Sequence, residues 1–233
     1  MWEEELLENL MELIGHVKLS LNNDSWVCDM GAEEGYSVKD GYHFLSKNFL
    51  PEVVQNESVR RVLKMVWESF APMKIMIFSW QSMLHRLPTR VNLFRRGVIT
   101  ASSLACCVWC GGEMESESHL FTCTVAVDVW RAVYSWLGVC TVVPGNIFQS
   151  FESFGYPFKC KKRAKGLILI WQTVIWCLWK ARNSIIFEGK VQRIYDIVEA
   201  IKRRSLEWFT ARKFAGVCML YEWEKAPLLC LLR

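Results

Sequence analysis

The chain has 233 residues, of which 52% are hydrophobic, and it contains 12 tryptophans. A chain of this length and composition can bury a large apolar core, which excludes an intrinsically disordered protein. Its net charge of +4 is unevenly distributed, because residues 1–40 carry ten acidic and two basic residues, whereas the other 193 carry 14 acidic and 26 basic ones. This basic body is typical of proteins that bind polyanions such as nucleic acid, although a solvated lysine-rich surface would give the same count.

The first five residues, Met1–Glu5, lack the basic and apolar regions of a secretory signal. We therefore expect an intracellular protein, in the nucleus or the cytoplasm, that is not secreted. The most apolar run, residues 167–179, contains 13 residues, whereas a helix needs about 20 to cross a bilayer. No membrane is expected among the partners.

Most of the sequence has the 3.6-residue hydrophobic periodicity of helices, so the predicted fold class is mainly α. One exception is a small N-terminal β-hairpin with arms Trp26–Cys28 and Tyr36–Val38 around a glycine-containing loop. Ser37 is the expected cap of a helix that ends before Pro51. The other expected helices cover residues 3–21, 73–87, 90–96, 119–137, 162–184 and 192–212, with a short helix or turn over 59–67 and a loop over 139–157.

Three cysteines and one histidine form the pattern C-x2-C-x8-H-x3-C, with Cys107, Cys110, His119 and Cys123 at its fixed positions. A C-x2-C pair on a tight turn supplies two of the four ligands of a tetrahedral zinc site. His119 and Cys123 are four residues apart, so a helix that begins here would turn both side chains toward one ion. A reducing compartment disfavours disulfides between the ten cysteines, so the pattern predicts a Zn²⁺ site that fastens a loop to a helix start.

Two alternatives to this ligand set stay open. The cysteines could be small buried hydrophobic residues and His119 a hydrogen-bonded neighbour, with no metal. Cys106 could also replace Cys107 as a ligand, although its spacing from Cys110 suits a tight turn less well. Ser116 or Ser118 is the expected cap of the helix that carries the histidine.

These patterns divide the chain into four segments. We expect an acidic leader helix, hairpin and helix over residues 1–58, and a zinc-binding helical domain over 59–138. A C-terminal helical segment should cover 139–213, and an irregular tail 214–233.

Four arginines lie within eleven residues just before the cysteine motif: Arg86, Arg90, Arg95 and Arg96. They would form a basic patch beside the zinc loop, and arginine suits phosphate contacts, so RNA or DNA is the expected partner. A second basic patch is expected over Lys159–Lys165. The competing interpretation is that the arginines pair with the three glutamates between Gly112 and Ser118 and leave no charge for a ligand.

Further short motifs surround the cysteines: Gly35–Lys39, Trp67–Lys74, Phe78–Trp80, Arg86–Arg90, Leu93–Gly97, Trp179–Asn183 and Phe187–Gly189. Together with the Cys/His pattern, they resemble the reverse-transcriptase zinc-binding domain found at the C-terminal side of plant LINE-like non-LTR retrotransposon polyproteins. The resemblance is densest over residues 60–137. It implies that Cys107, Cys110, His119 and Cys123 are the zinc ligands. Val108-Trp109 and Thr124 depart from the family pattern, which often has proline at these places.

This resemblance implies a non-catalytic accessory domain, with the reverse transcriptase domain of the parent element as a further partner. A polymerase palm needs paired aspartates and an RNase H site a carboxylate cluster, whereas this chain has five scattered aspartates and no Asp-Asp pair. We therefore expect neither an enzyme nor a small-molecule substrate. Two functions stay open, a nucleic-acid-binding module and a structural or protein-interaction domain whose zinc only stabilises the fold.

Overall fold

A computed structural model describes residues 2–16, 37–49, 57–100, 106–140, 144–155, 160–211 and 218–232. The chain divides into two compact units, Met1–Val54 and Gln55–Arg233. Every regular element in the described ranges is a helix, which confirms the mainly α fold class.

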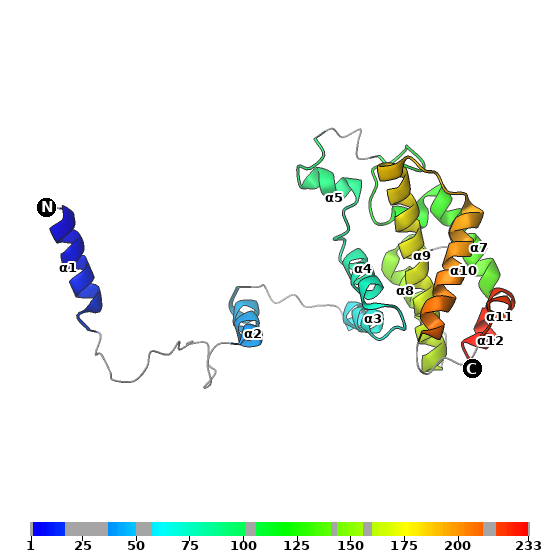
Figure 1. Cartoon of the computed structure of the whole chain (residues 1–233), viewed down its shortest axis with the longest axis horizontal. Helices are drawn as coiled ribbons and strands as arrows, with labels where there is room; N and C mark the ends of the chain where they lie inside the picture. Colours follow the sequence, from blue (N-terminus) through cyan, green and yellow to red (C-terminus); the bar gives the residue numbers. More distant parts are fainter. Residues whose placement is uncertain are drawn as a thin grey trace. The chain divides into compact units, whose positions relative to one another are not determined.

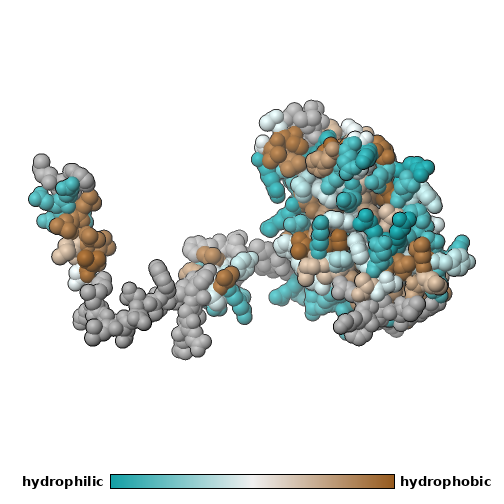
Figure 2. Space-filling view, viewed as in Figure 1, coloured by the Kyte–Doolittle hydropathy of each residue, from teal (hydrophilic) through white to brown (hydrophobic). Residues whose placement is uncertain are grey.

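The first unit contains α1 (Trp2–Ile14) and α2 (Val38–Phe49). In α1 the acidic first turn suits the helix dipole, and its leucines form an exposed apolar stripe (Figure 2). Ser37 caps α2 as expected, because its Oγ accepts the backbone N–H of Asp40 at 3.1 Å. The predicted hairpin is not borne out: Ser37 and Val38, expected in its second arm, cap and begin α2, and the rest of the hairpin lies outside the described ranges.

The second unit is a bundle of helices around one long central helix (Figure 1). Its helices in chain order are α3 (Glu57–Trp67), α4 (Met73–Met83), α5 (Arg90–Arg95), α6 (His119–Thr122), α7 (Thr124–Leu137), α8 (Ile147–Gly155), α9 (Lys161–Glu188), α10 (Ile194–Thr210), α11 (Leu220–Lys225) and α12 (Pro227–Cys230).

The central helix α9 is buried on most of its circumference, which explains why its sequence is apolar on every side rather than in one stripe. Leu169, Ile170 and Trp171 are completely inaccessible to solvent. Helices α4, α6, α8 and α10 pack against it. None of the described helices, α9 included, is long and apolar enough to cross a membrane.

Aromatic side chains connect α9 to the segment that carries the cysteine motif. Phe121 of α6 stacks on Trp130 of α7, with ring centroids 5.4 Å apart, and on Trp171 of α9, at 5.9 Å. The indole N–H of Trp130 donates to the backbone carbonyl of Leu120 at 2.8 Å. The helix that follows the metal motif is therefore fixed by buried aromatic packing.

Three helices occur where the sequence predicted a loop or an irregular tail. Helix α8 lies within the expected loop over 139–157 and buries Phe151 and Phe154. Helices α11 and α12 lie within the expected tail over 214–233, where Trp223 and Leu231 are fully buried. These segments are too short for a clear hydrophobic period, so tertiary packing decides their conformation.

Helix α4 ends at Met83, before the predicted end at Leu87. His85 adopts a left-handed conformation with φ 53°, and the backbone N–H of Arg86 donates to the carbonyl of Gln81 at 2.8 Å. This is a Schellman-type helix end, with histidine at the position that glycine usually occupies.

The boundary between the two units, after Val54, lies close to the one expected after residue 58. The helices on either side of the other expected boundaries, at 138 and 213, pack within the second unit.

Candidate metal centre

The metal motif begins with a tight turn over Cys107–Cys110. The backbone N–H of Gly111 donates to the carbonyl of Cys107 at 2.8 Å, and that of Trp109 donates to the Cys107 sulfur at 3.4 Å. Gly111 has φ +67°, which glycine adopts without the steric cost of a Cβ. The turn therefore closes with Val108-Trp109 in place of a proline-containing pair.

A short antiparallel bridge closes the loop that follows this turn. Cys106 pairs with Met114, and the backbone N–H of Cys107 donates to the carbonyl of Glu113 at 2.8 Å. The side chains of the turn are thus held at the base of a small loop rather than on a free segment.

The third cysteine, Cys123, lies between two helices. It ends α6 and precedes α7, with φ −64° and ψ 143°, and its carbonyl accepts the backbone N–H of Val127 at 2.8 Å. His119 and Cys123 therefore do not lie on one continuous helix, because the helix that begins at His119 breaks at the cysteine and restarts at Thr124.

This break brings the sulfur of Cys123 to the turn. The sulfurs of Cys107, Cys110 and Cys123 all lie within 4.8 Å of one another, and those of Cys107 and Cys123 are 3.8 Å apart. Tetrahedral coordination with Zn–S bonds of about 2.3 Å places sulfurs about 3.8 Å apart, so the three thiols fit a zinc ion. Cys106 is not in this group, and its carbonyl instead accepts a hydrogen bond from the Arg90 guanidinium at 3.0 Å.

His119 does not belong to this cluster, because its ring nitrogens do not lie within 4.8 Å of all three sulfurs. Its side chain is buried, and it lines the same small cavity as Cys107. Its Nδ1 accepts the backbone N–H of Ser116 at 3.3 Å, and its Nε2 lies 3.8 Å from a carboxylate oxygen of Glu113. The geometry thus brings together three of the four predicted ligands and leaves the fourth adjacent.

The expected serine cap of this helix does not form. Ser118 has helical φ and ψ and makes no side-chain capping bond, and its hydroxyl lies 2.6 Å from that of Ser116. Instead, the amides of His119 and Leu120 each donate to the carbonyl three residues before them, those of Ser116 and Glu117, in a tight turn that leads into α6.

Two of the clustered thiols are hydrogen-bonded to each other, since the Cys107 sulfur donates to that of Cys123 at 3.8 Å. The hydrogen bond between Cys107 and Cys123 raises the pKa of the Cys107 thiol, and burial raises it further. The same hydrogen bond lowers the pKa of Cys123 to about 7, because it stabilises the thiolate. The cluster therefore provides a thiolate near neutral pH, and the thiolate is the form that binds metal.

The loop beside the thiols is fastened to α9 by a buried ion pair. The side chains of Arg182 and Glu115 are each only 5% exposed, and the Arg182 Nε lies 3.0 Å from a carboxylate oxygen. The Arg182 guanidinium also lies 4.6 Å from the ring centroid of Trp179 and donates to Asn183 Oδ1 at 2.9 Å. The sequence analysis missed this pair, although Arg182 stands out as a charge directly after the apolar run of α9.

Glu115 and Glu117 also connect the loop to the start of α5. The backbone N–H of Arg90 donates to the Glu115 carboxylate at 3.2 Å, and Asn92 Nδ2 donates to the Glu117 carboxylate at 2.7 Å. The second oxygen of Glu117 lies 3.5 Å from Nδ1 of His85. The loop glutamates are therefore occupied by Arg182, Asn92 and backbone groups, not by the guanidinium groups of the four arginines.

The four arginines have different environments. Arg90 is half-buried and bound to the Cys106 carbonyl, whereas Arg86, Arg95 and Arg96 are exposed. Within the described part of the chain these three make no ion pair. Of the second basic patch, Lys159 lies outside the described residues and the others form the first turn of α9.

Comparison with known proteins gives one match. Residues 36–130 match the model of a family described as zinc-binding in reverse transcriptase, a stretch that runs from the start of α2 into α7 and includes the whole Cys/His motif. No curated protein and no solved structure matches the chain. The resemblance of the motifs is thereby confirmed over residues 36–130, which are similar to the family described as zinc-binding in reverse transcriptase.

Proposed function

We propose that this chain is a non-catalytic zinc module of a non-LTR retrotransposon polyprotein, and that it contacts nucleic-acid phosphates beside the metal. The observation that carries the proposal is the convergence of three sulfurs, from a tight turn and a helix break, within 4.8 Å in a chain whose matched family binds zinc. Zn²⁺ prefers thiolate and imidazole ligands in structural sites. Bound here, it would cross-link the Cys107–Cys110 turn to the start of α7.

The fourth ligand in this proposal is His119. With Nδ1 accepting an amide proton, the neutral ring carries its own proton on Nε2. Binding through Nε2 requires the neutral ring to carry its proton on Nδ1 instead, which would open the hydrogen bond from the Ser116 N–H. Binding through Nδ1 requires the contact with Ser116 to open. Metal binding therefore includes a small rearrangement of the ring or of the Ser116 peptide.

The proposed nucleic-acid contacts come from the three exposed arginines, Arg86, Arg95 and Arg96. Arg95 is the last residue of α5, Arg96 follows it and Arg86 precedes the helix, whose first residue is hydrogen-bonded to Glu115 and the Cys106 carbonyl of the zinc loop. Metal binding would thus fix the position of this basic surface. Because the second unit carries most of the basic residues, long-range attraction to phosphate adds to these local contacts.

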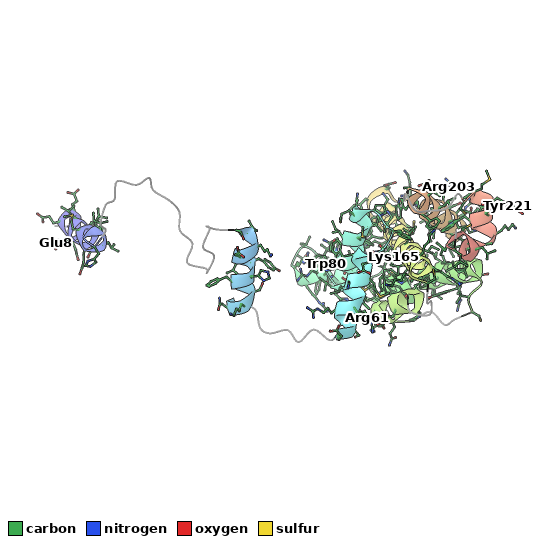
Figure 3. The ribbon with its side chains drawn as sticks, turned by 90° about the horizontal axis from the view of Figure 1, so that it is seen from below. Glu8, Arg61, Trp80, Lys165, Arg203 and Tyr221 are labelled. Carbon is green, nitrogen blue, oxygen red and sulfur yellow. The ribbon has the colours of Figure 1, made fainter. Side chains whose placement is uncertain are left out.

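The test is RNA binding by the zinc-loaded full chain as a function of salt. We expect affinity to fall steeply with salt, and the double variant Arg95→Ala, Arg96→Ala to flatten the log–log slope by about two or slightly less. The matched control is Arg203→Ala, Arg204→Ala, which removes two exposed arginines from α10 (Figure 3). An equal effect of both double variants would mean that only net charge matters, and an unchanged slope in the first would reject contacts at α5.

A structural or protein-interaction role, for example docking on the reverse transcriptase domain of the parent element, is the second candidate. The observation in its favour is that the buried pair of Glu115 and Arg182 fastens the zinc loop to α9, so zinc would act on the fold alone. In this case metal analysis would find zinc, while RNA binding would be no stronger than for an unrelated protein of equal charge.

A further inference from the structure

The C-terminal helices bring together a second set of metal-ligating side chains, far in sequence from the first. Cys218 lies two residues before α11, Glu222 lies in the first turn of α11, and Cys230 is the last residue of α12. The chain reverses at Ala226-Pro227, between the two helices. As a result, the two sulfurs and a carboxylate oxygen of Glu222 all lie within 4.8 Å of one another.

These helices are fixed to the core before any ligand binds. Trp223 of α11 is fully buried, stacks on Phe209 of α10 with centroids 5.3 Å apart, and donates its indole N–H to Ser205 at 3.1 Å. Its carbonyl accepts the indole N–H of Trp136 at 3.0 Å. Figure 3 shows α11, which carries Tyr221, beside the helix of Arg203, α10. A site on these helices is therefore preorganised.

The carboxylate of the cluster is held in a defined orientation. One oxygen of Glu222 accepts the backbone N–H of Met219 at 3.0 Å, which fixes the side chain at the start of α11. Hydrogen bonds of this kind orient carboxylate ligands in metal sites.

We propose that Cys218, Glu222 and Cys230 form a second Zn²⁺ site, with the fourth coordination position open to water. Two thiolates select a soft or borderline ion over Mg²⁺ or Ca²⁺, and a carboxylate completes a common zinc donor set. Both cysteines are buried, at 8% and 1% exposure, and Glu222 is half-buried. Cysteines that only fill a core need no carboxylate beside them, whereas here a carboxylate oxygen lies within 4.8 Å of both sulfurs.

The test is the zinc content of the full chain, purified with a thiol reductant and passed through a desalting column. We expect two zinc ions per chain in the wild type and one in the double variant Cys218→Ser, Cys230→Ser. The matched control Cys140→Ser, Cys160→Ser removes two exposed thiols and should keep both ions. Cys110→Ser should lose the ion at the Cys107–Cys123 motif but keep the C-terminal ion. The zinc contents of the two variants therefore show separately whether each site binds zinc.

A milder variant keeps the test valid if the double serine variant does not fold. Glu222→Gln retains an oxygen that can accept the Met219 N–H but removes the charge. We expect zinc affinity at this site to fall roughly tenfold or more, because losing even an outer partner of a metal ligand costs this much. The ¹¹³Cd-loaded chain should also give two NMR signals, one of which disappears in the double serine variant.

Two results would overturn the proposal. One is a wild-type chain with a single zinc ion whose amount is unchanged in Cys218→Ser, Cys230→Ser. The other is a disulfide between Cys218 and Cys230, found by peptide mapping of chain that was purified with zinc and without reductant.

Discussion

The zinc loop, residues 106–123, and the helices around α9 belong to the same compact unit but are held together by different interactions. Around α9 the contacts are apolar and aromatic, and many side chains of this helix are fully buried. In the loop the interactions are polar: three sulfurs cluster together, Glu115 and Arg182 form a buried ion pair, and carboxylates accept hydrogen bonds. The α9 core can therefore form without an ion. The folded conformation of the loop, in contrast, is stable only when a cation binds its thiols and its buried charged groups keep their partners.

Zinc removal should separate the two regions most clearly. Structural zinc is worth on the order of 10 kcal/mol in small sites, so chelation or Cys110→Ser should unfold the loop locally. We expect hydrogen exchange to become fast in residues 106–123, while the amides of α9 stay protected. Cys140→Ser, which removes an exposed thiol elsewhere, is the control. Equal loss of protection in both regions would show that the loop and the core unfold as one unit.

Breaking the ion pair between the regions should have the next largest effect. Arg182→Met leaves the buried Glu115 carboxylate without its partner, which should lower the free energy of unfolding by about 3–5 kcal/mol. Urea denaturation of the zinc-loaded chain measures this loss. The double variant Glu115→Gln, Arg182→Met removes both charges and should recover part of it. If the two variants are equally unstable, packing of the arginine on Trp179 matters more than the charge pair.

A change in the core should leave the zinc loop intact. A Cβ on Gly166 of α9 would collide with the side chain of Leu231, so Gly166→Ala should destabilise the chain by about 1–3 kcal/mol. The intrinsic helix propensity of alanine acts in the opposite direction, by roughly 1 kcal/mol. Adding Leu231→Ala removes the collision and serves as the control. Thermal denaturation should show the loss, while the zinc content of the motif stays constant.

The smallest effect is expected at the end of α4. His85 has φ 53°, so His85→Gly relieves steric cost but also removes the contact with Glu117. We expect a net change in unfolding free energy below about 1 kcal/mol, and a loss for His85→Ala, which keeps the Cβ without the contact. Paired thermal melts of the two variants measure the difference. A more stable alanine variant would contradict this account.

Local signals in the sequence were sufficient for the features that depend on neighbouring residues. Gly97 and Gly138 directly follow the expected helix ends at residues 96 and 137, and they have φ 70° and 65°, the left-handed conformation that glycine adopts at a helix end. The spacing of the cysteines likewise predicted which sulfurs converge. The pair of Glu115 and Arg182 could not be predicted from neighbouring residues, because 67 residues separate the partners. A glutamate in a polar loop is also normally expected to be exposed.

The stacked aromatic rings next to the metal motif should allow metal binding to be followed by spectroscopy. The indole of Trp130 is hydrogen-bonded to the carbonyl of Leu120, the residue after His119, and Phe121 lies against both Trp130 and Trp171. A shift of α6 when the histidine engages an ion changes the asymmetric field around these chromophores. Near-ultraviolet circular dichroism should therefore follow metal loading of the native chain without an added dye, and Trp130→Phe should silence most of that signal.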